Sequence, residues 1–309
     1  MRRVSTAWLL ILLCGSLAWA PRVAAAANPI PGISLSPFEE QLTIEPTDTA
    51  KSFNLVLGNH TPVVQYLNLK TQDFGTLGNT GGIRLENNSY TKRYGLAAWL
   101  SLGKTSVSLT PGQTATVAVT IHNRLSLGPG GHYGAIVVGV GNGSKNQGSQ
   151  VAINQQLLSL ILVDKVGGDH YDLALTGVTS NGNLLRAPTD VRLSFQNPGN
   201  VHVIPRGLVK LTSPTGTIVA QGVINTQSAF ILPGTSRELH VSLTALAKAA
   251  AVPGPYRLTA QYRYDGITTY ATKHYFVDYL NVGSWAVLGV LTVVGFGWTL
   301  TRRPRRPTA

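Results

Sequence analysis

Residues 109–121 read LTPGQTATVAVTI, a Pro-Gly turn that leads into a run with apolar residues at every second position. Proline presets the backbone angle of the first turn position and glycine accepts a positive φ, so the pair is typical of a tight turn between strands. Successive side chains of a strand point to opposite faces, which places Val117, Val119 and Ile121 on one face. The stretch therefore predicts a strand that buries one face in a core.

Similar short runs, rich in β-branched and aromatic residues, recur along the chain and are separated by Gly, Pro and Asn. They include Phe53–Leu57, Ala135–Val138, Val191–Phe195 and Tyr256–Ala260. Short strands at regular intervals of about 10 residues are typical of antiparallel β-sandwiches. Only Leu243–Ala251 and Gln155–Leu162 could be helices, and we interpret Gln155–Leu162 as a strand because its apolar run is continuous and its flanks are rich in Gly.

An internal repeat divides these strands into two sets. The turn at Pro111 is followed 22 residues later by Tyr133 in a Gly-X-Tyr sequence, and the turn at Pro233 is followed 23 residues later by Tyr256 in another. Such a tyrosine at a strand corner is a structural feature of immunoglobulin-like domains. The first set holds an extra segment, at about Asp73–Leu102.

The two ends of the chain carry targeting signals. Arg2 and Arg3 precede an apolar stretch and a run of alanines, which is the order of a secretory signal peptide, assigned to residues 1–27. Residues 282–300 are apolar, uncharged and long enough to span a bilayer, and residues 301–309 follow as a basic tail. We predict a single-pass protein of the cell membrane that crosses it through Val282–Leu300, with an extracellular ectodomain and a cytoplasmic C-terminus.

The predicted fold class is therefore all-β, with two tandem immunoglobulin-like β-sandwiches followed by one transmembrane helix. We assign residues 28–166 to the N-terminal immunoglobulin-like domain and residues 169–278 to the second one. The prediction of two sandwiches rests on the repeat and the period-two pattern, and the prediction of the helix rests on the uncharged apolar stretch.

Charge and residue chemistry argue against several classes of function. Lys and Arg number 25 against 13 Asp and Glu, but seven of the arginines lie at the two ends, so we expect no nucleic-acid surface. The single cysteine, Cys14, lies in the predicted signal peptide and has no disulfide partner. The seven His are scattered without the spacing of a zinc site, and no Gly-X-Ser-X-Gly motif occurs. We expect no catalytic residues, no metal site and no cofactor, and thus no enzyme.

The extra segment of the first domain gathers residue types that suit ligand binding. Its cluster comprises Arg84, Asn87, Asn88, Tyr90, Lys92, Arg93, Tyr94 and Trp99. Aromatic faces stack on sugar rings, and Arg, Lys and Asn bond hydroxyl, amide and carboxylate groups. We select Tyr90, Arg93 and Trp99 as candidate ligand-binding residues, with a core position as the alternative for Trp99. A second candidate face is Tyr262–Asp265 with Tyr270.

Several short motifs occur in an order that resembles a known family. Ser36-Pro37, the strand ending at Asn59, Asp73-Phe74, Ala98-Trp99-Leu100, Leu109–Gly112 and Gly130–Ile136 follow one another. This order, with Asn197–His202 and Pro205–Gly207 behind it, resembles the WxL-interacting cell-surface proteins of bacteria, whose N-terminal immunoglobulin-like domain is described as peptidoglycan-binding. The resemblance implies a non-enzymatic, membrane-anchored cell-surface protein that binds peptidoglycan or another wall glycan, a surface protein, or both.

A second hypothesis is a chaperone-like or assembly factor of the pilus-chaperone kind. Such a protein presents an open sheet edge to a strand of another surface protein. Two tandem sandwiches suit this hypothesis, whereas the predicted membrane span does not, since those chaperones are normally free in the periplasm.

Overall fold

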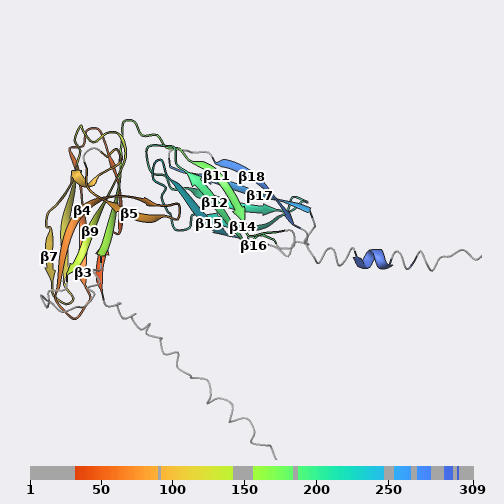
Figure 1. Ribbon diagram of the computed structural model, residues 1–309, viewed down its shortest axis with the longest axis horizontal. Coiled ribbons are helices and arrows are strands. Elements are labelled where there is room, and N and C mark those ends of the chain that lie inside the picture. The colour runs from red at the N-terminus through yellow and green to blue at the C-terminus, as the bar shows by residue number, and fades with distance from the viewer. Residues whose placement is uncertain are drawn as a thin grey trace, which may run out of the picture.

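The structure is a computed structural model that describes residues 32–89, 92–141, 156–183, 187–246, 254–265, 270–279, 289–294 and 298. It contains two immunoglobulin-like β-sandwiches, as the sequence predicts (Figure 1). The strands of the first sandwich run across the long direction of the second, and the hairpin of β4 and β5 extends from the first toward the second.

The first sandwich is built from ten strands and one short 3₁₀-helix. They are β1 (Ile33–Ser36), β2 (Glu39–Ile44), β3 (Ala50–Asn59), β4 (Gln65–Leu77), β5 (Gly82–Glu86), η1 (Ala97–Trp99), β6 (Leu100–Leu102), β7 (Ser106–Leu109), β8 (Thr114–His122), β9 (Gly130–Gly141) and β10 (Gln156–Lys165). One sheet has the order β1-β3-β8-β6, and the other has the order β2-β10-β9-β4-β5 with β7 also on β4. The chain passes from one sheet to the other between β1 and β2, so that β2 lies parallel to β10.

The second sandwich is built from eight strands. They are β11 (Ala174–Ser180), β12 (Asp190–Gln196), β13 (Arg206–Thr212), β14 (Ile218–Ile224), β15 (Ser236–Ser242), β16 (Thr244–Ala245), β17 (Gly254–Arg263) and β18 (Ala271–Tyr279). The sheets have the orders β11-β12-β15 and β16-β14-β13-β17-β18. In the stretch Leu243–Ala251, which could have been helical, Thr244–Ala245 form the short strand β16, and residues 247–251 lie outside the described residues. The interpretation of Gln155–Leu162 as a strand is confirmed by β10.

Each sandwich encloses its own apolar core because alternate side chains of its strands face inward. In β8, Val117, Val119 and Ile121 are at most 1% exposed, as the alternation in the sequence predicts. In the second sandwich Phe195 of β12 and Tyr262 of β17 meet edge to face in the core, with ring centroids 5.0 Å apart. These cores supply the hydrophobic stabilisation of the two domains.

The two domains share a further feature, one buried asparagine in each, Asn59 in the first and Asn197 in the second. The Asn59 Nδ2 donates to the carbonyl oxygens of Val63 and Leu109, at 2.8 and 2.9 Å. The Asn197 Nδ2 donates to those of Val201 and Ile231, both at 2.8 Å. In each domain the amide therefore ties the end of one strand to the segment before the Pro-Gly turn.

A third apolar cluster joins the two domains. The first domain contributes Phe74, Tyr133, Ala135, Leu160 and Leu162, and the second contributes Ile204, Phe230 and Leu232. Phe74 lies 6.3 Å from Phe230 between ring centroids. At the tip of the β4–β5 hairpin, the Glu238 N–H donates to the Asn79 carbonyl at 2.7 Å. Apolar packing and backbone bonding thus hold the second domain against the first.

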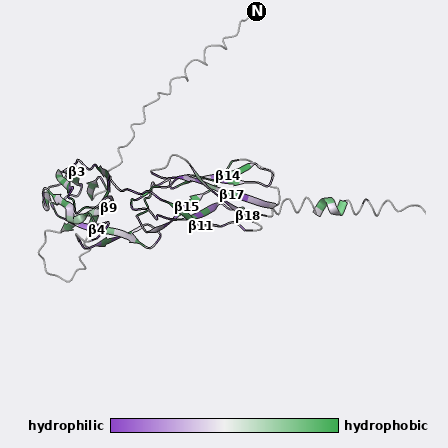
Figure 2. Cartoon of the chain, turned by 90° about the horizontal axis from the view of Figure 1, so that it is seen from above, coloured by the Kyte–Doolittle hydropathy of each residue, from purple (hydrophilic) through white to green (hydrophobic). Residues whose placement is uncertain are grey.

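The predicted transmembrane helix at Val282–Leu300 falls mostly outside the described residues. Of this stretch the structure describes residues 289–294, a short helical segment coloured largely hydrophobic in Figure 2, and residue 298. Within the described part of the chain, no helix combines the length and apolar character needed to cross a bilayer. The predicted signal peptide at residues 1–27 and tail at residues 301–309 also lie outside the described residues. The fold prediction is confirmed for the two sandwiches and not for the helix.

Candidate functional site

Strand β10 has an edge that its neighbour covers only in part. All ten residues of β10 pair with β9 on one side, from Gln156 opposite Gly139 to Lys165 opposite Gly130. On the other side β2 pairs only with Leu160 to Lys165. Among the described residues, no strand pairs with this side of Gln156–Ser159, which we call the open edge.

The direction of the backbone groups shows what the open edge offers. The Leu160 N–H donates to the Phe38 carbonyl at 2.8 Å, so the polar groups of Leu160 point toward β2. Backbone groups alternate in direction along a strand, and those of Leu158 and Gln156 therefore point to the same side. Each of these two residues presents one N–H donor and one C=O acceptor to an added strand.

Apolar side chains surround the open edge. Leu157 and Leu158 are half-buried. Phe38, which directly precedes β2 at the end of the open edge, is 69% exposed. The Ser159 Oγ donates to the Pro37 carbonyl at 2.7 Å, which fixes the chain where β2 begins. An added strand would thus find both main-chain partners and apolar contacts.

The other sheet edges in the described residues carry features that oppose strand addition. β1, β6, β7 and β16 have four residues or fewer, and β11 has an irregularity between Leu175 and Gly177. Charged residues occur in the remaining edge strands, namely Glu39 and Glu40 in β2, Arg84 and Glu86 in β5, Arg237 and Glu238 in β15, and Lys273 in β18. Short length, irregularity and charge protect edges against pairing. The open edge of β10 is also four residues long, but it belongs to a ten-residue strand and contains no charged residue and no irregularity.

A pocket of about 340 Å³ lies between the two domains, on the β4–β5 side of the sheet. Its walls are the β4–β5 hairpin, the segment 92–95 and the turn of the second domain at Leu232–Thr235. Apolar groups of Phe74, Tyr94, Tyr133, Leu232 and Pro233 line it together with the charged residues Asp73, Arg84, Glu86, Lys92 and Arg93. The extra segment predicted from the sequence therefore contributes directly to this pocket.

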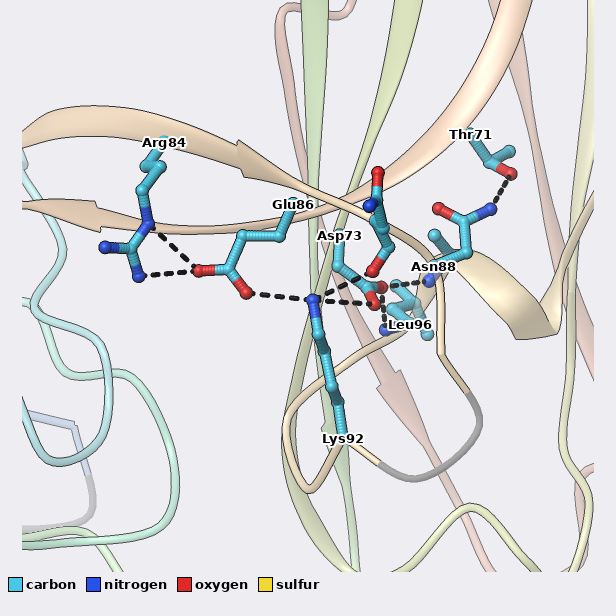
Figure 3. A network of polar contacts seen from close by, with 9 residues as sticks. Thr71, Asp73, Arg84, Glu86, Asn88, Lys92 and Leu96 are labelled. Atoms are coloured by element: carbon cyan, nitrogen blue, oxygen red, sulfur yellow. Dashed lines mark hydrogen bonds and ion pairs between the residues drawn. The ribbon is translucent and has the colours of Figure 1, made fainter.

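A chain of alternating charges orders the wall of the pocket (Figure 3). The Glu86 carboxylate accepts from the Arg84 Nη2 at 2.7 Å and from the Lys92 Nζ at 2.9 Å. The Lys92 Nζ lies 3.9 Å from the Asp73 Oδ2, and the Asp73 Oδ1 accepts from the backbone N–H groups of Leu96 and Ala97. Hydrogen bonds from Lys92 and then Arg84 hold the pKa of Glu86 below its ordinary value. These pairs fix the side chains before any ligand arrives.

The domain interface also holds buried titratable groups. The Tyr133 hydroxyl lies 3.5 Å from the His202 Nδ1, and burial lowers the pKa of His202 to about 4. The Tyr171 hydroxyl donates to the Asp164 Oδ2, and burial raises the pKa of Asp164. His202 is therefore neutral in the folded protein at neutral pH.

The structure places the sequence-predicted binding residues apart. Tyr90 lies outside the described residues. Arg93 is exposed, lines the pocket and lies over the Tyr94 ring, with its Cζ 5.2 Å from the ring centroid. Trp99 is 6% exposed and belongs to the core of the first sandwich, which was the alternative weighed for it. A ligand role for these residues stays a prediction.

The second candidate face, Tyr262–Asp265 with Tyr270, is split by the sheet. Tyr262 is 2% exposed and belongs to the core of the second domain, whereas Arg263 and Tyr270 are exposed and stack with 5.5 Å between the Arg263 Cζ and the Tyr270 ring centroid. Alternation along β17 gives this result, since neighbouring residues face opposite sides.

The sequence pattern did not single out the open edge of β10, because the sequence of β10 does not show how far β2 pairs with it.

Comparison with known proteins gives matches only at the level of solved structures. No family model and no curated protein sequence matches the chain. A class 5 fimbriae chaperone, CfaA, is similar at 12% identity and a TM-score of 0.43, with 81% of this chain and 100% of that chain covered. The complex of the CsuC chaperone with the CsuE tip subunit of Acinetobacter baumannii pili is similar at 10% identity, a TM-score of 0.39, and 81% and 100% coverage. The periplasmic chaperone SfaE is similar at 11% identity, a TM-score of 0.36, and 81% and 100% coverage.

These findings correct the family prediction. The resemblance to WxL-interacting proteins was wrong, because no family model matches and the similar solved structures are described as fimbrial chaperones. Peptidoglycan and cell-wall binding, which rested on that resemblance, receive no support. The predicted single-pass membrane location with an extracellular ectodomain is corrected as well, since no described helix could cross a bilayer and SfaE is described as periplasmic. The short motifs misled because they are turn and strand signals shared by immunoglobulin-like domains in general.

Proposed function

We propose that this protein is a non-enzymatic, chaperone-like or assembly factor that holds a strand of another surface protein at the open edge of β10. The observation that carries the proposal is the uncharged edge at Gln156–Ser159 of the ten-residue strand β10, which β9 pairs on one side only, whereas the other edges belong to strands that are short, irregular or charged. Addition of a strand to such an edge gives affinity through main-chain hydrogen bonds and specificity through alternate side chains.

The surroundings of the edge indicate the kind of strand that fits. Leu157 and Leu158 offer apolar contacts on the two faces of β10, and Phe38 offers another at the end of the open edge where β2 begins. A segment with apolar residues on alternate positions would bury these groups, and each fully buried aliphatic or aromatic side chain contributes about 1.5–3 kcal/mol. The low similarity to the solved chaperones gives the fold alone, so the proposal stands on the edge itself.

The test is strand addition measured by hydrogen exchange. A capped peptide of eleven or so residues with alternating Val and Thr serves as the probe, added in millimolar amounts to the full chain. We expect slower amide exchange at Gln156 and Leu158 and no change along β18 or β11. Protection along another edge, or no protection anywhere, contradicts the proposal.

A pair of proline variants sharpens the test. Leu158→Pro removes an N–H that points away from β9, so it blocks the open edge while the β9–β10 pairing stays intact. Leu125→Pro is the matched control: Leu125 is fully exposed and follows Arg124 in a turn closed by the Leu127 N–H to the Arg124 carbonyl at 3.0 Å, a position that proline favours. Peptide binding should be lost in the first variant and retained in the second. Equal binding by both variants would refute the assignment of the site.

A further inference from the structure

The pocket between the domains has more positive than negative charge among its lining groups. Three cations, Arg84, Lys92 and Arg93, face two carboxylates, Asp73 and Glu86. Glu86 forms ion pairs with both Arg84 and Lys92, and one carboxylate oxygen of Asp73 accepts a backbone hydrogen bond at the start of η1. Within the described residues, Arg93 is the cation of the pocket that forms no ion pair.

Arg93 is held in a position that suits recognition. Its guanidinium lies over the Tyr94 ring, with 5.2 Å between the Cζ and the ring centroid. A cation over an aromatic face is attracted to it, and stacking restricts the guanidinium while its N–H groups remain available at the edge of the plane. The planar fork of arginine matches a carboxylate in two parallel hydrogen bonds.

The apolar wall lies beside this cation. Phe74 is 5% exposed and Leu232 is 4% exposed, and both belong to the cluster that joins the domains. Pro233 and Tyr94 line the same pocket, and the Tyr94 ring lies against the Arg93 guanidinium. An occupant that contacts both parts of the pocket carries a carboxylate for Arg93 and a neighbouring apolar group for the wall.

The pocket is also fixed in shape. The Arg84–Glu86–Lys92 chain holds one wall, and the backbone bond from Glu238 to Asn79 holds the hairpin against the second domain. A pre-formed site loses little freedom on binding, which favours affinity for a small group.

We propose that this interdomain pocket binds an acidic side chain flanked by an apolar residue in a partner polypeptide, with Arg93 as the anchoring cation. The inference rests on the proposed function only in taking the occupant to be a polypeptide. The pocket lies on the β4–β5 side of its sheet, whereas the open edge of β10 lies toward β2. The pocket therefore provides a second contact, separate from strand addition.

The experiment uses capped dipeptides, which are too short to add a strand to β10. The full chain is titrated with N-acetyl-Leu-Glu-amide, and amide chemical shifts are followed by NMR. We expect shifts at Gly75, Gly95 and Thr235, which line the pocket, and none at Gln156 or Leu158. N-acetyl-Leu-Gln-amide, which lacks only the charge, should bind roughly tenfold more weakly.

Two arginine variants provide the control. Arg93→Gln should weaken binding of the glutamate peptide by roughly tenfold, whereas Arg124→Gln, at an exposed position of the same domain outside the pocket, should leave it unchanged. Equal affinity for the two peptides, an unchanged affinity in Arg93→Gln, or the absence of shifts at the three pocket amides would overturn the inference. Failure of this test leaves strand addition at β10 standing, and the reverse also holds, since the two probes engage different residues.

Discussion

Replacement of Asn197 by alanine should destabilise the second domain by about 3 kcal/mol. The Asn197 side chain is fully buried and makes three hydrogen bonds: its Nδ2 donates to the carbonyls of Val201 and Ile231, both at 2.8 Å, and its Oδ1 accepts the Gly199 N–H at 2.9 Å. Each such bond contributes about 1 kcal/mol net, and its loss leaves a buried backbone group without a partner. The sum is a large share of the stability of a domain of this size.

Asn197→Asp separates hydrogen bonding from packing, because the side chains have the same shape. The carboxylate cannot donate, and it lies against two carbonyl oxygens, so folding should raise its pKa. A raised folded-state pKa means that the stability is fully present below the ordinary Asp pKa of about 3.9 and is lost as the pH increases from there through the raised folded-state pKa. The loss of unfolding free energy in Asn197→Asp, measured against the wild-type protein at the same pH, should therefore be smaller at pH 4 than at pH 7.

Denaturant unfolding of the full chain measures both variants. Of the five tryptophans in the sequence, Trp99 is the one that the structure places in a sandwich core, so the change in tryptophan fluorescence on unfolding reports on the first domain, while far-ultraviolet circular dichroism reports on both. Asn59→Ala should shift the fluorescence transition, and Asn197→Ala should shift the circular dichroism transition more. Exposed Asn68→Ala, the control, should change stability by less than about 0.5 kcal/mol. An unfolding free energy of Asn197→Ala within about 1 kcal/mol of the wild-type value, which is about one hydrogen bond, would refute the structural role of this asparagine.

Three further predictions concern the domain interface and the core. Burial lowers the pKa of His202 to about 4, so the contribution of the neutral imidazole to stability is complete above about pH 6.5 and is lost as the pH falls toward 4. The loss amounts to at most about 3 kcal/mol. His202→Gln should flatten the pH dependence of the unfolding free energy in that range, and an unchanged slope would contradict the assignment. Trp99→Ala should cost about 3–5 kcal/mol in denaturant unfolding, since the ring is 6% exposed in the core, and a smaller cost than 1 kcal/mol would place the ring outside it. Gly81→Ala should loosen the hairpin from the second domain, because Gly81 has a φ of 88° and its added Cβ would lie 2.2 Å from the Arg237 Nη2; faster amide exchange at Glu238 measures this, and unaltered exchange would argue against the contact.

Part of the candidate site could be predicted from the sequence. The extra segment at about Asp73–Leu102 was expected to gather binding residues, and the structure brings Arg84, Lys92 and Arg93 to one pocket. Trp99 could not be assigned from local sequence, because an apolar run around a tryptophan is equally compatible with a core strand and a binding face. The other half of the pocket, Leu232–Thr235, comes from the second domain, and no local pattern predicts that contact.

The amino-acid sequence determined the period-two strands, the Pro-Gly turns and the repeat of two domains, because these depend on interactions between residues that are close in the chain. Only the tertiary structure decided that β2 begins its pairing with β10 at Glu39, opposite Leu160, and leaves Gln156–Ser159 of β10 without a second partner among the described residues. It also decided that Phe74 and Leu232, far apart in the chain, line one pocket together with Arg93. Pairing across sheets and packing between domains depend on contacts of long sequence separation, so the open edge and the interdomain pocket form only when the chain is folded.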